Sequence, residues 1–467
     1  MTTMTLRATA VLVALATTSA SLLASVPTAA AETTVDAGAA ALGLTSYTVS
    51  EVPASGDITT ALKRAVAIAG TTYQANVVHL SGRVSVSSII HPADYVYLVA
   101  DPGTTVTWRG SDGYLLRYNA GVTGGVTGGT WDGAGRSSTT LVGSAGAFVT
   151  LADLTLTHAG KYGVVGYEKS TLTLNNVTSS YNKVDGVHLE GSTLNATGLR
   201  SVYNRRNGVQ LSTGSVGTIS RSMLDRNGQA VSGSTDGKTG HGLGVASAVA
   251  ILTNTSLSKN KVCGASLTGS ANADISGSSL DGNGRHGLGT TPGTTARLSD
   301  STANSDGYNG VLASGSKTHV TLDRVTITAA KKMGLSVPSG GSATVTNSVI
   351  AVGKKYDISV STKGKLTLAG GNTISASRSH GITVSGKGSI SISGVGNLVT
   401  GSSKDGLRIT GSGTTGRIES SASFVSNRDS GIVVVSKAKL WMVPNCYFAG
   451  NKKSVEKRSG GKLYSLA

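Results

Sequence analysis

The most constraining feature of this chain is a repeat of about 23 residues that opens with a glycine and an alternation of aliphatic residues. Gly186-Val187-His188-Leu189 is the clearest example, and twelve such units run from Gly163 to Gly431. Successive units are 22 to 25 residues apart, except for one interval of 34 that places an insertion near Gly228–Gly240. A repeat this short cannot bury its own apolar face, so neighbouring repeats must stack on one another.

Each repeat contains three short runs in which apolar and polar residues alternate. In one repeat these runs are Gly186–Glu190, Thr193–Thr197 and Leu199–Tyr203. Alternation of period two is typical of a strand with one buried face, so Val187 and Leu189 should face a core while His188 and Glu190 face solvent. The pattern predicts an all-β fold, a parallel β-helix with three strands per coil and about 12 or more coils spaced by about 4.8 Å.

The chain ends differ from the repeats. Residues 1–31 resemble a secretory signal peptide, with Arg7 as the only charge and a small-residue cleavage site at Ala29-Ala30-Ala31. A membrane anchor is the alternative, but the apolar stretch is short for a span, so we expect a secreted, extracellular protein. We divide the rest into a lead segment (32–55), a β-helix domain (56–450) and a basic, mobile C-terminal tail (451–467). An amphipathic helix at 57–69, N-capped by Asp57, should cap the core.

Two further predictions follow from stacking. Cys263 and Cys446 lie about eight coils, or roughly 38 Å, apart, which is too far for a disulfide. Asparagines recur four residues before the repeat glycine, and we expect their side chains to form a structural ladder along the turns. They are Asn182, Asn204, Asn260, Asn283 and Asn427.

The charge of the chain is concentrated in the turn before each repeat glycine. Lys and Arg total 41 against 24 Asp and Glu, giving a net charge of +17. Ten of the twelve repeats carry Lys or Arg two or three residues before the glycine. They are Lys161, Lys183, Arg205 with Arg206, Lys261, Arg285, Lys331 with Lys332, Lys354 with Lys355, Arg378, Lys404 and Arg428. Stacked like charges repel, so the column suits a long polyanion; a solvated column that prevents aggregation is the alternative.

The chain resembles the pectin-lyase-like superfamily of right-handed parallel β-helices. The resemblance rests on the order of a capping helix, first strands, the run Gly128-Gly129-Thr130-Trp131-Asp132-Gly133 and the repeats. That run is similar to a segment of polygalacturonases, which Asp185-Gly186 and Gly240-His241-Gly242 also match. Arg206-Asn207 stands where those enzymes have an Asp pair, and Ala265–Thr268 has no cation. Inverting hydrolysis needs two carboxyl groups, so the resemblance implies the fold and a cleft along the first strand of each coil, but not the hydrolase activity.

The candidate catalytic residues lie in the repeats of Gly186, Gly208 and Gly242. They are Asp185, His188, Glu190, Arg205, Arg206 and His241. This basic and imidazole set suits β-elimination from a uronic acid: an arginine, or a Ca²⁺ held by Asp185 and Glu190, would neutralise the carboxylate, and His188 would be the base. His188 and Glu190 could instead form an exposed pair. Because His-Gly also occurs at 286 and 380, His241 could be only a turn residue.

Substrate-binding candidates lie along the same column. They are Tyr181, Lys183, Tyr203, Lys261, Arg285, Lys331, Lys354 and Arg378. The two tyrosines could stack on sugar rings or plug their turns. We therefore predict a monomeric polysaccharide lyase acting on an anionic, uronic-acid-containing polymer, with no resident metal or cofactor beyond the calcium alternative. A non-catalytic binder of wall or matrix polysaccharide and a glycoside hydrolase are the alternatives. Nucleic acid is disfavoured, because the sequence contains no aromatic pattern of the single-strand-binding type.

Overall fold

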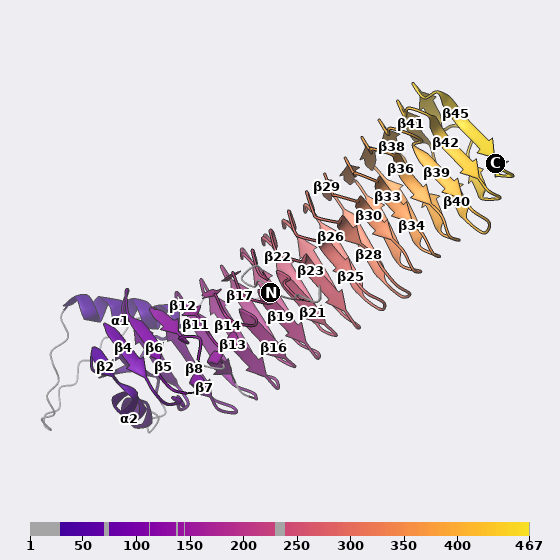
Figure 1. Ribbon diagram of the computed structural model, residues 1–467. Helices are drawn as coiled ribbons and strands as arrows, with labels where there is room; N and C mark the ends of the chain where they lie inside the picture. Colours follow the sequence, from indigo (N-terminus) through magenta and orange to yellow (C-terminus); the bar gives the residue numbers. More distant parts are fainter. Residues whose placement is uncertain are drawn as a thin grey trace, which may run out of the picture.

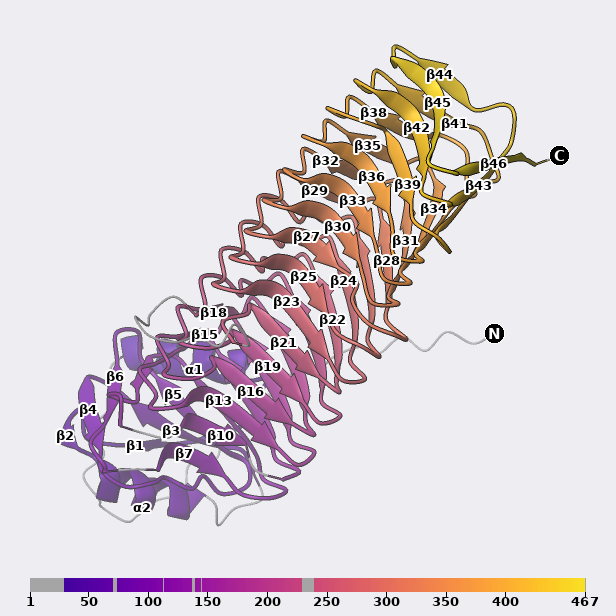
Figure 2. The same ribbon diagram turned by 45° about the vertical axis from the view of Figure 1, so that its right-hand side comes forward.

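The computed structural model describes residues 29–69, 74–111, 113–136, 139–143, 145–228 and 239–466. In this part of the chain, parallel strands stack coil upon coil into a long rod, with the N-terminal coils at one end and the C-terminal coils at the other (Figures 1 and 2). All inter-strand pairings are between successive coils and parallel, as in Val187↔Val209 and Leu194↔Gly217. The predicted parallel β-helix is confirmed.

Three faces of the rod are sheets. Sheet 1 has 18 strands: β1 Thr48–Glu51, β3 Asn76–Leu80, β5 Val96–Ala100, β8 Thr123–Thr127, β11 Phe148–Ala152, β14 Thr171–Asn175, β17 Thr193–Thr197, β20 Val216–Ser220, β22 Val249–Thr253, β24 Asn272–Ser276, β26 Thr295–Ser299, β28 His319–Asp323, β31 Ser342–Thr346, β34 Lys365–Gly370, β37 Ser389–Ile392, β40 Thr415–Ile418, β43 Lys439–Met442 and β46 Lys462–Ser465. Sheet 2 has 15 strands: β7 Tyr114–Tyr118, β10 Thr139–Gly143, β13 Tyr162–Tyr167, β16 Val187–Glu190, β19 Val209–Ser212, β21 Leu243–Ala246, β23 Cys263–Thr268, β25 His286–Thr290, β27 Asn309–Leu312, β30 Met333–Val337, β33 Tyr356–Val360, β36 His380–Val384, β39 Leu407–Thr410, β42 Ser430–Val435 and β45 Lys453–Arg458.

Sheet 3 is split into blocks of 7 and 6 strands, joined by single bridges through Met223, Ser256, Ser279 and Thr302. Its strands are β2 Ser55–Asp57, β4 Arg83–Val86, β6 Thr105–Trp108, β9 Thr130–Asp132, β12 Thr155–Thr157, β15 Thr178–Ser180, β18 Arg200–Val202, β29 Thr326–Thr328, β32 Val349–Ala351, β35 Thr373–Ser375, β38 Asn397–Thr400, β41 Ala422–Val425 and β44 Tyr447–Ala449. Each coil runs from sheet 2 to sheet 1 to sheet 3, and a turn then leads into the next strand of sheet 2.

One coil illustrates why the repeat folds this way. The three predicted runs become β16, β17 and β18, and the side chains of Val187 and Leu189 are wholly buried in one continuous core. The repeat glycine is needed for close packing, because a Cβ on Gly186 would lie 2.0 Å from the hydroxyl oxygen of Ser201 in the same coil and 2.8 Å from the carbonyl oxygen of Gly208 in the next coil. His188 also departs from expectation, because it points outward yet its side chain is only 11% exposed.

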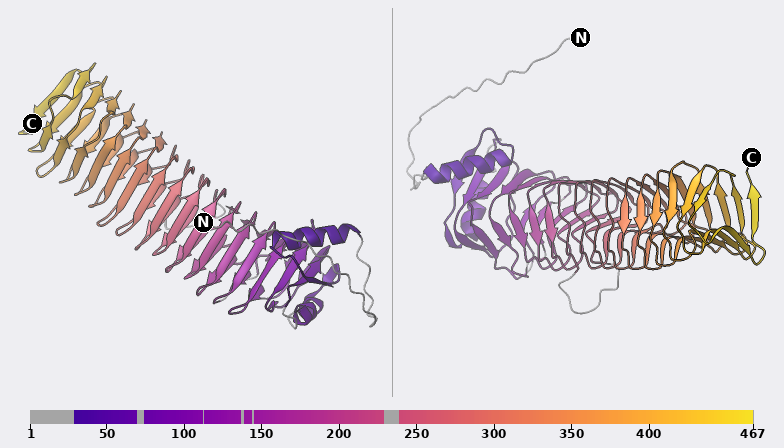
Figure 3. Two further views of the ribbon diagram at one scale, coloured as in Figure 1. Left: turned by 180° about the vertical axis from the view of Figure 1, so that it is seen from behind. Right: turned by 90° about the horizontal axis from the view of Figure 1, so that it is seen from above.

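Two helices lie at the N-terminal end of the rod (Figure 3). Helix α2, Thr59–Ala69, places Leu62 and Val66 in the main core, and the Asp57 carboxylate accepts a hydrogen bond from the backbone N–H of Thr59, so the predicted capping helix is present. Helix α1, Ala29–Ala41, was not predicted. It packs on the outer side of sheet 1, where Val35 and Leu42 join a small apolar cluster with Val77, Tyr97 and Val99.

The C-terminal segment corrects one prediction. Residues 451–467 were expected to form a mobile basic tail, but Lys453–Arg458 pairs with β42 and Lys462–Ser465 pairs with β43. Val455 and Leu463 pack against the core. The basic residues are accommodated because Glu456 forms ion pairs with both Lys453 and Arg458.

Side-chain ladders confirm the stacking. The amide of Asn182 donates to Asn204, and the series continues through Asn227, Asn260 and Asn283, with donor–acceptor distances of 2.9 to 3.2 Å. Asn427 likewise donates to Asn451 at 3.1 Å. Both cysteines are unpaired, as predicted.

Some predictions fall outside the described residues. They include most of the proposed signal peptide, at residues 1–28, and the core of the insertion, at residues 229–238. In the remaining chain, no helix is long and apolar enough to cross a membrane.

Candidate functional site

The predicted basic residues lie on one edge of the rod. All of them fall in the turns that lead from sheet 3 into sheet 2, and we call this edge the cationic edge. Most of these side chains are exposed, including Lys161, Lys183, Arg205 and Arg206, whereas Lys261 is half-buried. Successive strands of sheet 2 are in register, so the charges repeat with the coil spacing of about 4.8 Å.

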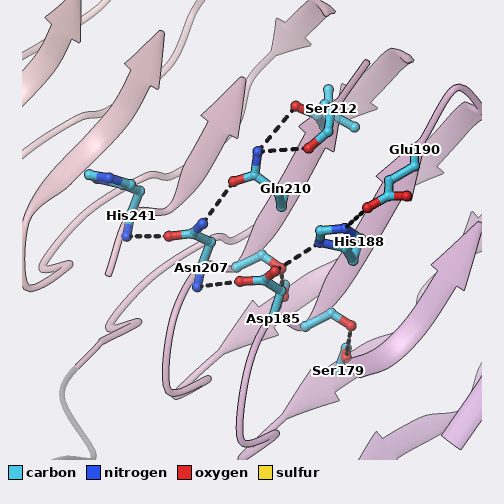
Figure 4. A network of polar contacts seen from close by, with 12 residues as sticks. Ser179, Asp185, His188, Glu190, Asn207, Gln210, Ser212 and His241 are labelled. Carbon is cyan, nitrogen blue, oxygen red and sulfur yellow. Dashed lines mark hydrogen bonds and ion pairs between the residues drawn. The ribbon is translucent and has the colours of Figure 1, made fainter. Parts of the chain in front are cut away.

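Beside this edge, sheet 2 carries a histidine held between two carboxylates (Figure 4). Nδ1 of His188 lies 3.0 Å from a carboxylate oxygen of Asp185, and Nε2 lies 3.3 Å from Glu190. Asp185 is completely buried, whereas the Glu190 side chain is 54% exposed. The two carboxylates therefore differ in role: Asp185 fixes the orientation of the imidazole, and Glu190 covers the nitrogen that faces solvent.

Tyr162 completes this cluster from the preceding coil. Its ring stacks on His188 with ring centres 4.5 Å apart and planes inclined by 24°. Burial opposes protonation of His188, but the hydrogen bonds and charges of Asp185 and Glu190 outweigh it, so the pKa of His188 lies above its ordinary value. Burial, with the charge of Asp185, also raises the pKa of Tyr162, which keeps its phenol protonated.

A polar network extends from Asp185 into the next two coils (Figure 4). The second oxygen of Asp185 accepts the backbone N–H of Asn207 at 2.9 Å, and the Asn207 amide donates to Gln210 at 2.8 Å. The side-chain amide oxygen of Asn207 accepts the backbone N–H of His241 at 3.0 Å. His241 is thus joined to the network by its backbone, while its Nδ1 accepts the backbone N–H of Cys263, so its ring is not directed at His188.

The structure brings together Asp185, His188 and Glu190 from the predicted catalytic set. Arg205 and Arg206 are exposed in the turn of the adjacent coil, and Arg206 is close enough to influence Tyr162 electrostatically. Lys183 reaches across to the backbone carbonyl of Gly135 at 2.9 Å. The sequence analysis missed Tyr162, although it directly precedes a repeat glycine and therefore lies one coil before Asp185.

Tyr181 and Tyr203 form a stack of side chains and not two separate sugar platforms. Their rings are 5.3 Å apart and almost parallel; His158 stacks on the other side of Tyr181 at 5.8 Å, and Arg226 covers Tyr203 at 5.7 Å. Both faces of each tyrosine ring are therefore occupied. A ligand on this edge would meet ring edges and hydroxyl groups, not open aromatic faces.

The proposed calcium site is not supported. Asp185 and Glu190 do not converge on a common point, because one oxygen of each approaches His188 and the other oxygen of Asp185 accepts from Asn207. Within the described residues, no group of three or more His, Cys, Asp or Glu side chains could hold a metal ion.

Comparisons with known proteins concern the architecture. A family model described as a right-handed β-helix region matches residues 140–295 and 197–350, and one described as periplasmic copper-binding protein (NosD) matches residues 334–464. No curated protein matches in sequence. Similar structures include the mannuronan C-5 epimerase AlgE4 A-module of Azotobacter vinelandii, at 14% identity over 90% of this chain and 100% of that chain with a TM-score of 0.40. The periplasmic alginate epimerase AlgG matches at 11% identity over 71% of this chain and 78% of that one, with a TM-score of 0.39.

Copper does not fit the part of the chain that the second family model covers. Copper sites are built from imidazole, thiolate and thioether ligands. Residues 334–464 contain one histidine, one cysteine and one methionine, which are His380, Cys446 and Met442, and His380 already contacts Asp405 through Nδ1 at 3.1 Å. We therefore assign no chemistry to copper in this protein.

The stacked parallel coils, together with the match of residues 140–350 to the right-handed β-helix family model, show that this chain folds as a right-handed parallel β-helix.

Proposed function

We propose that this protein is a secreted lyase for an anionic polysaccharide that contains uronic acid. The observation that carries the proposal is the Asp185–His188–Glu190 arrangement, stacked on Tyr162, beside a continuous cationic edge. It combines a base of raised pKa, a protonated phenol and exposed guanidinium groups within neighbouring coils.

The chemistry assigns a separate task to each group. Arg205 or Arg206 pairs with the uronate carboxylate, which makes the neighbouring C5–H bond more acidic. His188, once Glu190 releases Nε2, takes the C5 proton, and the electrons of that bond form the C4–C5 double bond. The C4–O4 bond breaks, and the phenol of Tyr162 protonates the leaving O4. Asp185 acts as a positioning residue, because it is buried and reaches the substrate only through His188.

Hydrolysis is less well supported by the same residues. A glycoside hydrolase requires two carboxyl groups on opposite sides of the scissile bond. Asp185 is wholly buried and both of its oxygens accept hydrogen bonds, so it has no access to a glycosidic oxygen or to a water molecule. Glu190 alone cannot perform both steps.

A location outside the cytoplasm accords with the apolar N-terminal segment, and both the NosD family and the alginate epimerase AlgG are described as periplasmic. The test of the activity is to incubate the protein with polygalacturonate and alginate and to follow the ultraviolet absorbance of the unsaturated product. Salt-sensitive binding without product would support the non-catalytic binder. If deuterium exchanges into C5 in heavy water but no unsaturated product forms, the assignment of His188 as the base is kept and the elimination step is wrong.

A further inference from the structure

A second cluster on sheet 2 repeats the arrangement of the proposed catalytic site far along the rod. Asp405-Gly406-Leu407-Arg408 occupies the same register as Asp185-Gly186-Val187-His188, with Arg408 aligned on His188 through the intervening strands. The two positions are nine coil steps apart, which corresponds to about 43 Å.

The side chains of this second cluster are also similar. The carboxylate of Asp405 is almost fully buried and lies 3.1 Å from Nδ1 of His380 and 3.4 Å from the guanidinium of Arg408. Tyr356 from the preceding coil stacks on His380 at 6.0 Å. Arg408 stands where the first cluster has its histidine, and because a guanidinium keeps its proton, Arg408 can bind a carboxylate but cannot serve as the base.

Cations flank this part of sheet 2 on both sides. The cationic edge supplies Lys332, Lys355, Arg378, Lys404 and Arg428. The opposite edge, formed by the turns from sheet 2 into sheet 1, supplies Lys317, Lys363, Lys387 and Lys437, all exposed. Lys332 also lies over the ring of Tyr308 at 3.7 Å, which orients its ammonium group above the turn.

The lysines of the opposite edge occupy unfavourable backbone conformations. Lys363 and Lys387 both have a φ of 65°, in the left-handed region that costs a non-glycine residue about 1–2 kcal/mol. Beside the first cluster the same edge has glycine at Gly191 and Gly214, with φ of 60° and 76°, and a lysine one coil earlier, Lys169, with φ of 69°. The chain thus retains positive side chains at Lys363 and Lys387 where glycine would be conformationally easier, and in these two successive coils both edges are cationic.

Asp429 lies beside Lys404 and Arg428 and offsets part of this charge, but the other nearby carboxylates do little to reduce it. Asp357 is buried without a partner for one oxygen, and burial raises its pKa to about 8, so it is largely neutral at pH 7. Asp405 is engaged by His380 and Arg408, and Glu456 by Lys453 and Arg458. Between the two clusters, sheet 2 presents mostly short outward side chains, such as Ser266, Gly289 and Ser359, which leave a flat path.

We infer that Arg408, Lys363 and Lys387 form a non-catalytic anchoring subsite for the same polyuronate that reaches His188. The inference rests on the proposed function and adds that the binding affinity depends on the length of the polymer. A sugar unit of about 5 Å matches the coil spacing, so a chain that occupies both subsites contains about nine units or more. Because one polymer then binds at two places, long oligomers bind more tightly than short ones by about tenfold or more.

The experiment measures binding of oligogalacturonates and oligomannuronates of about four and about twelve units, chosen to fall below and above the nine-coil span. The variant K363G/K387G/R408Q removes the subsite, and glycine suits both positive-φ positions, so folding is preserved. The single variant K387G is matched with R221G, which removes an exposed cation at φ 47° on a turn from sheet 1 into sheet 3. We expect the triple variant to lose about tenfold or more in affinity for the long oligomers only, and R221G to change it less than about twofold.

Four outcomes overturn the inference. If the wild-type protein binds short and long oligomers equally, the anchoring subsite is wrong. It is also wrong if the triple variant still prefers long oligomers. In both cases the proposed function stands as long as short oligomers are turned over normally. If the wild-type protein binds neither length, both proposals fail. If single-stranded DNA of matching length binds as tightly as the oligouronates and is affected equally by the substitutions, the edge recognises polyanions in general and the choice of polysaccharide is wrong.

Discussion

Replacing Asp185 by Asn should destabilise the protein in a pH-dependent manner. Asp185 and His188 are both buried, and their hydrogen bond of 3.0 Å joins a carboxylate to an imidazolium. Losing a charge-assisted hydrogen bond of this kind costs about 1.5–3 kcal/mol. The pKa of folded His188 is raised above its ordinary value of 6.5, so its contribution to stability is fully present below that pH and is lost as the pH rises through the folded-state pKa.

The assay is urea unfolding of the wild-type protein and D185N, followed by circular dichroism at pH 6 and pH 9. We expect D185N to lose about 1.5–3 kcal/mol at pH 6 and less at pH 9, because the imidazolium of the wild-type protein loses its proton as the pH rises through the folded-state pKa of His188. E190Q is the matched control, since it removes an exposed partner of the same imidazole and should cost less than about 1 kcal/mol. Equal losses for D185N at the two pH values would refute the assigned charge state of His188.

Three other outcomes follow from the same contacts. Because the charge of Glu190 raises the pKa of His188, E190Q should move the low-pH limb of the activity profile to lower pH, and a shift in the opposite direction would contradict the base assignment. Asp306 ends the asparagine ladder, and burial raises its pKa to about 8, so the buried carboxylate lowers the free energy of unfolding as the pH rises above its ordinary pKa of 3.8. D306N should therefore stabilise the protein by about 1–3 kcal/mol at pH 8 but not at pH 3, as measured by urea unfolding. Asn204→Ala interrupts the buried ladder on both sides and should lower the free energy of unfolding by about 1–3 kcal/mol in the same assay. Ser305→Gly, at an exposed turn residue with a φ of 57°, should not destabilise the protein.

The regular part of this fold was predictable because the sequence repeats with a period of about 23 residues. Glycines that would clash with the next coil, such as Gly186, and alternating residues such as Val187 and Leu189 fix the register of every strand. The ladder was found at the regular spacing, while Asn227 was missed because the insertion separates it from its repeat glycine. These features depend only on contacts between successive repeats.

Features that depend on irregular packing were not predictable. Helix α1 docks on outward-facing residues of sheet 1 such as Val77 and Val99, which alternation alone cannot distinguish from a solvated face. The C-terminal strands were predicted to be a charged tail, because the composition of the segment does not show that Glu456 forms ion pairs with its basic residues. For the site, the sequence suggested His188 but not its burial, since the ring of Tyr162 comes from the preceding coil.

The central claim is that His188 removes the C5 proton of a polyuronate. The most direct test compares wild-type protein with H188Q on polygalacturonate and alginate, measuring unsaturated product and polymer binding in the same samples. The account predicts product from at least one polymer with the wild-type protein, and a loss of about 10²-fold or more in H188Q with binding retained. Full activity in H188Q, or no product and no C5 exchange with the wild-type protein on either polymer, would contradict it.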